Sequence, residues 1–153
     1  MLSCPSFVIT KAEPKDLIEI LKLQYEAYQS EAILYKDFSI QPLTQTLEQM
    51  VQEYQESTFL KAVGNGKIIV SVRAQEKLNT VYINKLMVLP AYQNRGLGKR
   101  LLQAMEQEFP GKRYELFTGA KSVKNLTLYE KSEYVRYQEE KKSSDLVLVY
   151  LQK

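Results

Sequence analysis

The sequence predicts a fold that mixes helices and strands, of the α/β or α+β class, in a single domain over residues 1–153. The expected elements follow in the order strand, two helices, three strands, helix, strand, helix, two strands. The chain has 153 residues, of which 44% are hydrophobic and 25% charged, which suits one globular domain with a sizeable core. No internal repeat, low-complexity tract or linker is evident in it.

The N-terminal part is expected to hold one strand and two helices. Residues 7–12 have the composition of a strand. Pro14 suits the first turn of a helix over residues 14–29, whose apolar side chains lie near one face. Residues 30–41 are expected to form an irregular connection. Apolar residues then recur at helical spacing and predict a second helix over about residues 43–56.

Three strands are expected next. Residues 59–63 form the first, and Gly64-Asn65-Gly66 then predicts a hairpin, because an Asn-Gly pair accepts positive φ angles. Residues 67–75 form the returning strand, and a turn around residues 77–79 leads to the third, over residues 80–88. The high apolar content of that third strand favours a central position in the sheet.

The C-terminal part alternates helices and strands. A helix is expected over residues 98–109, followed by a strand over residues 114–118. A further helix spans residues 123–132, and two strands over about residues 134–141 and 145–151 complete the sheet.

The composition argues against several classes of function. Histidine is absent from the sequence, which removes the commonest general base and the commonest metal ligand, so we expect no metal. Cys4 is the single cysteine, which rules out an internal disulfide, and we expect it to be a bystander thiol. The net charge of +3 suits an anionic cofactor but gives little support to nucleic-acid binding.

We expect a cytoplasmic protein with no membrane partner. No apolar run approaches the roughly 20 residues that a membrane span needs. Residues 1–5 have neither the basic region nor the apolar core of a signal peptide.

The most informative segment covers residues 88–102, which have the features of a strand end, a turn and a helix start. Gly96 and Gly98 remove side chains where the backbone must approach something closely, and Arg95 and Lys99 add positive charge. Free amide groups at a helix N-terminus, together with the helix dipole, bind anions. The segment therefore predicts a site for a phosphate or pyrophosphate.

Two common nucleotide-binding motifs do not fit this segment. The dinucleotide fingerprint needs a third glycine where this chain has Leu101, and the P-loop needs a glycine at Gln93 and a serine or threonine at Arg100. What remains is Gln-x-x-Gly-x-Gly over residues 93–98, preceded by Leu-Met-Val-Leu-Pro over residues 86–90. This pattern resembles the acetyl-CoA-binding motif of the GCN5-related N-acetyltransferase (GNAT) superfamily, in which the turn holds the pyrophosphate of coenzyme A.

The resemblance covers essentially the whole chain, because the order of the expected elements also matches that family. It implies a mixed, mostly antiparallel central sheet of about six to seven strands flanked by about four helices. It also implies an acyltransferase that moves an acetyl group from acetyl-CoA to a primary amine, by direct attack within a ternary complex. A small-molecule amine is the acceptor that we expect.

A second motif lies in residues 124–131, Lys-Asn-Leu-Thr-Leu-Tyr-Glu-Lys, which are similar to a later coenzyme A motif of the family. The resemblance implies that Tyr129 lies near the cofactor sulfur and gives a proton or a hydrogen bond to the departing thiolate. A phenol with an ordinary pKa of about 10 suits this acid role. A packed aromatic with a satisfied hydroxyl is the alternative. Asn125 lies on the same helix face and is expected to reach the pantetheine amides, with Ser122 as a weaker candidate.

The resemblance also implies that the strand over residues 80–88 diverges from its neighbour, so that its backbone near Met87 and Val88 pairs with the pantetheine arm. An amide there can polarise the thioester carbonyl. Ordinary pairing within the sheet is the alternative. The residues expected to bind acetyl-CoA are Leu86, Met87, Val88, Gln93, Asn94, Arg95, Gly96, Leu97, Gly98, Lys99, Asn125, Tyr129 and Lys131.

The general base is not evident. Period-two alternation places on one face Tyr82, Asn84, Leu86 and Val88, none of which is a usable base at neutral pH. The conceivable carboxylates are Glu31, Asp37 and Glu115, and loss of the proton to solvent water is the other route. By analogy, the residues expected to border the acceptor pocket are Tyr25, Tyr28, Glu31, Tyr35 and Asp37.

Two positions depart from the family, and the first of them is Val70, which stands in the strand over residues 67–75 where a glycine is frequent. The second is Glu133, which stands where the family usually has a glycine after the tyrosine helix, and left-handed geometry costs a non-glycine residue roughly 1–2 kcal/mol. Three other functions stay open: acetylation of protein amino groups, a non-catalytic acetyl-CoA-binding sensor or partner module and, third, a nucleic-acid-binding module. The acceptor and a possible homodimer are not determined by the sequence.

Overall fold

The computed structural model of the chain describes residues 7–153, and Cys4 therefore lies outside the described residues. They form one seven-stranded sheet in the order β1-β2-β3-β4-β5-β7-β6. Neighbouring strands are antiparallel except β4 and β5, which are parallel. The sheet is therefore mixed and mostly antiparallel, as the resemblance implies. Within residues 7–153, no helix is long and apolar enough to cross a membrane.

The strands lie close to their predicted positions, with one exception. Their bounds are β1 Thr10–Lys11, β2 Thr58–Gly64, β3 Lys67–Lys77, β4 Thr80–Val88, β5 Arg113–Gly119, β6 Val135–Lys141 and β7 Val147–Gln152. The exception is β1, which is shorter than residues 7–12 because it pairs with β2 only at Thr10 and Lys11. The hairpin between β2 and β3 is confirmed, with φ angles of 53° at Asn65 and 72° at Gly66.

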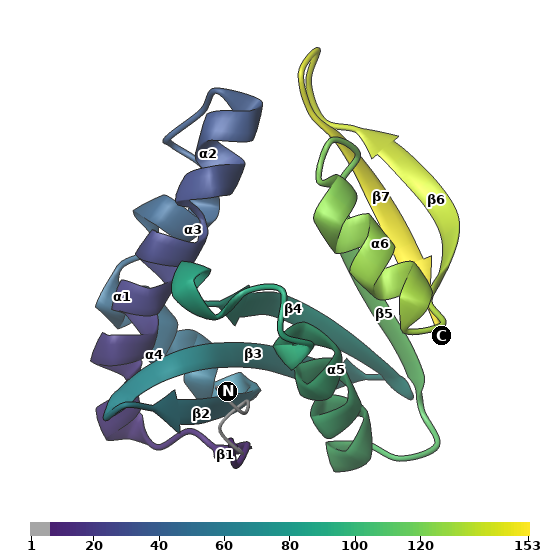
Figure 1. Cartoon of the computed structure of the whole chain (residues 1–153). Coiled ribbons are helices and arrows are strands. Elements are labelled where there is room, and N and C mark those ends of the chain that lie inside the picture. Colours follow the sequence, from purple (N-terminus) through teal and green to yellow (C-terminus); the bar gives the residue numbers. More distant parts are fainter. Residues whose placement is uncertain (1–6) are drawn as a thin grey trace.

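Helices cover both faces of the sheet. Their bounds are α1 Leu17–Ala27, α2 Gln29–Tyr35, α3 Gln41–Thr44, α4 Leu47–Glu56, α5 Leu97–Glu108 and α6 Val123–Lys131, with single 3₁₀ turns at Pro14–Asp16 and Pro90–Tyr92. In Figure 1, α5 and α6 lie in front of the sheet, while α4 lies behind it and packs against α1. Both α1 and α5 contact β3 and β4, so these two strands lie at the centre of the core.

The expectation of an irregular connection over residues 30–41 is wrong for its first half, because α2 occupies residues 30–35. Ala32 is the buried hydrophobic residue of α2, so the helix has no apolar stripe that a sequence pattern could show. It is stabilised instead by polar contacts with the start of α6, which are described below.

The predicted helix over residues 43–56 begins later than expected. Thr46 forms a capping box with Gln49: the Gln49 amide donates to Thr46 Oγ1 at 3.1 Å, and the Thr46 amide donates to Gln49 Oε1 at 2.9 Å. This cap starts α4 at Leu47. The residues before it form the separate short helix α3.

β4 contains a bulge that changes the orientation of its side chains. Asn84 lies opposite Arg73 of β3, and Met87 lies opposite Ser71, so β4 has one residue more than β3 between these pairs. Lys85, with a φ of 53°, marks the bulge. The alternation predicted from sequence groups Tyr82, Asn84, Leu86 and Val88 on one face. It is wrong beyond Asn84, because cross-strand partners share a face and the bulge brings Met87 to that face instead.

A buried polar cluster fixes α1 and α4 against β3. The Arg73 side chain is 1% exposed, and its guanidinium donates to Gln24 Oε1 of α1 at 2.6 Å and to Glu53 Oε1 of α4 at 2.6 Å. The guanidinium also lies 4.5 Å from the centroid of the Phe59 ring. Charge-assisted hydrogen bonds of this kind are the strong ones, so the cluster sets where α1 and α4 lie on this face.

Candidate active site

The main cavity opens where β4 and β5 separate. Within residues 7–153 the two strands pair only at Thr80–Tyr82 and Arg113–Glu115, so residues 83–88 of β4 have no partner there on that side (Figure 1). The cavity has a volume of about 970 Å³. It is lined by α2, β4, the β4–α5 turn, β5, α6 and the turn between β6 and β7. The divergence that the resemblance implies is therefore present.

The free edge of β4 presents backbone groups to this cavity. The Leu89 amide donates to Ile69 O of β3 at 2.8 Å, and successive residues of a strand direct their N–H and C=O groups to opposite sides. The Val88 amide therefore faces the gap between β4 and β5. Its carbonyl oxygen accepts a hydrogen bond from Gln93 Nε2 at 3.2 Å, which fixes the following turn against the strand.

The turn before α5 exposes the N-terminus of that helix. Gly96 is the N-cap residue with a φ of 78°, a value that favours glycine, and no side chain caps the helix there. Asn94 is also left-handed, with a φ of 63°. The first residues of α5, Leu97 to Lys99, line the cavity, so their amides and the helix dipole form a potential anion site.

Glycine is required at the two positions of the motif for different reasons. At Gly96 a Cβ atom would meet nothing within 4 Å, so the requirement is the φ angle. At Gly98 a Cβ atom would lie 2.8 Å from Leu128 Cδ2 of α6 and 3.5 Å from Leu86 Cδ2 of β4. Gly98 therefore allows α5 to pack closely against α6 and β4.

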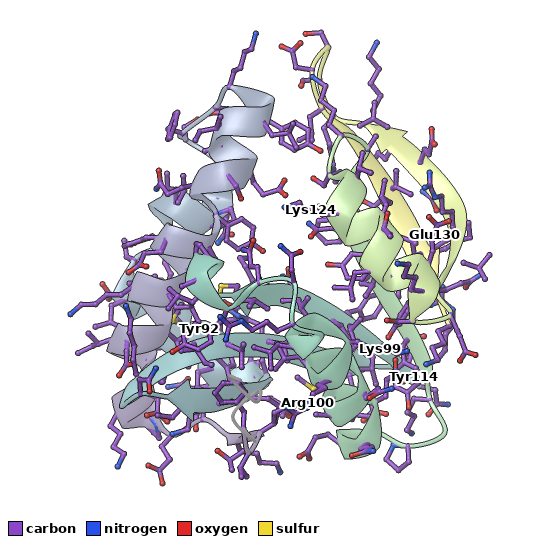
Figure 2. The ribbon with its side chains drawn as sticks, viewed as in Figure 1. Tyr92, Lys99, Arg100, Tyr114, Lys124 and Glu130 are labelled. Atoms are coloured by element: carbon purple, nitrogen blue, oxygen red, sulfur yellow. The ribbon has the colours of Figure 1, made fainter. Side chains whose placement is uncertain are left out.

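Most of the residues expected to bind acetyl-CoA line this one cavity. They are Leu86, Met87, Val88, Gln93, Asn94, Gly96, Leu97, Gly98, Lys99, Asn125 and Tyr129. Arg95 and Lys131 are not among the lining residues: the Arg95 guanidinium lies 5.3 Å from the Tyr92 ring centroid, and Lys131 is exposed in the last turn of α6. Figure 2 shows Tyr92 beside the β4–α5 turn and Lys124 on α6, and both of these line the cavity.

Comparison with known proteins identifies this arrangement. The family model described as an acetyltransferase (GNAT) domain matches residues 24–153. The chain belongs to the GNAT acetyltransferase family. A search of curated proteins found no match.

Solved structures share the GNAT fold at low sequence identity. The ribosomal-protein-S18-alanine N-acetyltransferase from Escherichia coli is 17% identical, with a TM-score of 0.79 over 96% of this chain and 92% of that chain. The PaiA N-acetyltransferase from Thermoplasma acidophilum, in complex with coenzyme A, is 17% identical, with a TM-score of 0.75 over 95% and 98%. The putative acetyltransferase YncA from Salmonella typhimurium, with its cofactor acetyl-CoA, is 17% identical, with a TM-score of 0.76 over 97% and 93%.

Within this GNAT domain, Tyr129 of α6 reaches the cavity wall. Its side chain is 7% exposed, and its ring centroid lies 6.4 Å from that of Tyr134. Burial raises the pKa of the Tyr129 hydroxyl well above its ordinary value, and Tyr28 and Glu31 act in the same direction. The raised pKa keeps this hydroxyl protonated at neutral pH. Among residues 7–153 no hydrogen-bond partner of it is seen and it lines the cavity, so it is free to donate.

Asn125 makes contacts that its motif does not suggest. Its amide nitrogen donates to Thr118 Oγ1 at 3.2 Å and, at 3.5 Å, to Glu31 Oε1 of α2. Ser122 Oγ donates to the other Glu31 oxygen at 2.7 Å. Tyr35 Oη lies 3.0 Å from Ser122 Oγ. These contacts join α2 to the start of α6 across one side of the cavity.

The residues expected at the acceptor pocket divide in two groups. Those that line the main cavity are Tyr28, Glu31, Tyr35 and Asp37. Tyr25 does not, because its hydroxyl donates to Gln45 O at 2.6 Å inside the α1–α3 packing. Glu115, considered as a base, lines a smaller cavity of about 150 Å³ and pairs with Arg113 at 2.8 Å.

Sequence reasoning missed Lys85. This lysine occupies the bulge of β4, is 9% exposed and lines the main cavity. Burial, and to a lesser degree the Arg73 cation, lowers its pKa from 10.5 to about 8. The one signal for it in the sequence is its position as a lysine inside an apolar strand. Period-two alternation assigns Lys85 to the face opposite Asn84.

The end of α6 keeps its form without a glycine. Glu133 adopts a φ of 73°, and the Tyr134 amide donates to Tyr129 O at 3.0 Å across it. The backbone of Glu133 therefore adopts the left-handed conformation although the residue is not glycine. The helix that contains Tyr129 ends as the family motif implies.

Proposed function

We propose that this chain is an N-acetyltransferase that moves an acetyl group from acetyl-CoA to a primary amine within a ternary complex. The observation that supports it most is the free edge of β4 beside the uncapped N-terminus of α5, both lining one cavity. Structures of the same fold contain coenzyme A and acetyl-CoA, which agrees with this choice of cofactor. The proposed chemistry uses no metal.

In this proposal the cofactor follows the free edge and ends at the helix. The amides of Gly96 to Lys99 hold the pyrophosphate, where the dipole of α5 and the Lys99 ammonium favour negative charge. The pantetheine arm lies along β4 like an added strand. The Val88 amide then donates to the thioester carbonyl and stabilises the oxyanion that forms during attack.

The chemical step is direct transfer. The neutral acceptor amine attacks the thioester carbonyl carbon, the new C–N bond forms and the C–S bond breaks. Tyr129, whose raised pKa keeps it protonated, gives a hydrogen bond or a proton to the departing thiolate. Holding both substrates in one cavity supplies much of the acceleration through proximity and orientation.

The acceptor that we propose is a small-molecule amine. The contacts of Glu31 and Tyr35 with Ser122 bridge α2 and the start of α6 across one side of the cavity, which favours a small acceptor over a polypeptide. Acetylation of protein amino groups is the alternative, and the fold neighbour from E. coli is named for such an activity.

The test measures thiol release from acetyl-CoA with a panel of amines and, in parallel, acetyl-CoA binding by calorimetry. Wild-type protein should release thiol with at least one amine, and Tyr129→Phe should lower kcat about 100-fold with little change in the acetyl-CoA Kd. Unchanged turnover in Tyr129→Phe would remove the acid role. Binding without thiol release for any amine would favour the non-catalytic sensor.

A further inference from the structure

Lys85 is turned into the cavity wall by the bulge of β4. Its φ of 53° is unusual for a lysine, and its amide donates to Asn84 Oδ1 at 2.8 Å, which stabilises the turn locally. The bulge lies where β4 has already separated from β5, so the lysine stands at the divergence of the two strands. Bulges next to active sites re-aim side chains in this way.

The surroundings of the Lys85 ammonium disfavour its charge. The charged and titratable groups nearest to it or across the cavity are Arg73 of β3, Glu53 of α4, Tyr28 between α1 and α2, Glu31 of α2 and Tyr129 of α6. The Glu53 carboxylate already accepts from Arg73 at 2.6 Å and from Gln45 at 2.9 Å. Throughout residues 7–153, no ion pair or hydrogen bond to Lys85 Nζ is present.

Three other titratable groups of the cavity are poorly suited to take a proton. Glu31 already accepts from Ser122 and Asn125. Asp37 accepts from the amide and hydroxyl of Ser39, and these bonds lower the pKa of its carboxyl. Burial raises the pKa of Tyr28 far above neutrality, so its hydroxyl keeps its proton. Lys85, by contrast, is a nearly buried amine that forms no ion pair with any residue of the described part of the chain.

We propose that Lys85 is the general base of the proposed acetyl transfer, taking a proton from the ammonium group of the bound acceptor. The inference rests on the proposed function and adds the residue that the sequence did not provide. The Lys85 Nζ lone pair accepts one proton from R–NH₃⁺, which leaves R–NH₂ and a Lys85 ammonium. R–NH₂ attacks the thioester carbonyl carbon, the C–N bond forms and the C–S bond breaks. The second amine proton passes to the coenzyme A thiolate by way of the Tyr129 hydroxyl, so the products are the N-acetyl amine and the free thiol, and Lys85 later releases its proton to water.

The kinetic test compares Lys85→Met and Lys85→Arg with wild type across pH 6 to 10. Arginine keeps the positive charge but cannot lose a proton in this range. Both variants should bind acetyl-CoA as wild type does and lose about 100-fold in kcat, and the wild-type acid limb of kcat/KM, near pH 8, should disappear. Lys77→Met, an exposed residue at the end of β3 outside the cavity, is the matched control and should keep full activity.

A second measurement needs no acceptor. The extent of acetic anhydride labelling of Lys85, followed by mass spectrometry of its peptide across pH, should show a midpoint near 8 in the folded protein. In urea the same peptide should titrate near 10.4, the value of an unperturbed lysine. A folded midpoint near 10 would overturn the proposal.

The remaining outcomes separate the base role from the function itself. Wild-type turnover in Lys85→Arg would overturn the base role alone and assign Lys85 to binding an anionic group of the acceptor. Stoichiometric acetylation of Lys85 by acetyl-CoA, with loss of acetyl transfer to the amine, would make Lys85 itself an acceptor. This result would also overturn the base role. A wild-type protein that transfers to no amine would overturn the proposed function and the base role together.

Discussion

Replacing Lys85 by methionine should make the protein more stable at neutral pH. The fold holds this ammonium 9% exposed and without an ion-pair partner among the described residues, so folding disfavours its charged form. Its pKa falls from 10.5 to about 8, and at 1.36 kcal/mol for each unit this corresponds to about 3 kcal/mol. Methionine keeps a flexible apolar stem in the same space, so the packing cost should be smaller than this gain.

The gain should depend on pH with a definite sign. The folded-state pKa lies below the unfolded one, so below pH 8 the lysine is protonated in both states and the folded protein carries the full cost. Above pH 10.5 it is neutral in both states and the cost is gone. The stability of wild type relative to Lys85→Met should therefore rise between pH 8 and 10.5.

Urea unfolding at several pH values from 7 to 10.5, followed by circular dichroism, measures this difference. Lys77→Met serves as the control, since an exposed substitution should change stability by no more than about 0.5 kcal/mol at any pH. A Lys85→Met protein that is less stable than wild type at pH 7, or whose difference from wild type is constant with pH, would refute the reasoning. Either result would mean that the lysine is charged and well solvated in the folded state.

Three further substitutions test other contacts. Gly96→Asp should abolish acetyl-CoA binding in calorimetry, because it adds bulk and negative charge where the pyrophosphate is proposed; undiminished binding would disprove that location. Gly119→Ala should destabilise the protein by about 1–2 kcal/mol in urea unfolding, because a Cβ there would lie 1.8 Å from Tyr35 Oη and must displace that ring from its hydrogen bonds. Glu53→Gln should cost about 3 kcal/mol in the same assay, because it leaves the Arg73 guanidinium buried without its counter-charge, and an unchanged midpoint would show that the pair contributes nothing.

Local sequence signals were sufficient for much of the fold and for the cofactor side of the candidate site. The Asn-Gly hairpin and the Gln-x-x-Gly-x-Gly turn depend on φ angles that only a few residue types adopt easily, so their sequences are distinctive. The strand over residues 80–88 matches β4 because apolar residues predominate on both sides of Asn84 and Lys85. Where the local conformational preference of a few residues dominates, the sequence of that segment alone is enough to predict its structure.

Features that depend on contacts between distant segments could not be predicted in this way. α2 has little apolar periodicity and is stabilised by Glu31 and Tyr35, whose partner Ser122 lies 91 and 87 residues away in sequence. The bulge at Lys85 depends on how β4 pairs with β3, where it produces a register shift. Asn125 illustrates the same limit, since its helix position was predictable while its contact with Glu31 was not.

Two left-handed non-glycine residues and one buried ammonium lie along the proposed acetyl-CoA path, while other left-handed residues such as Asn65 and Leu78 lie in turns elsewhere. Lys85 and Asn94 take left-handed geometry at either end of the segment that presents the free β4 edge, at roughly 1–2 kcal/mol for a typical non-glycine residue and less for asparagine. Lys85 adds the cost of a buried ammonium. If this segment were selected for packing alone, we would expect a regular strand with an apolar residue at position 85. Backbone strain and buried charge persist in proteins where the surrounding structure enforces them and where function uses them. The decisive comparison is therefore made on a single variant: Lys85→Met should be more stable and less active than wild type, and a variant that is more stable with full activity would break the link between the two.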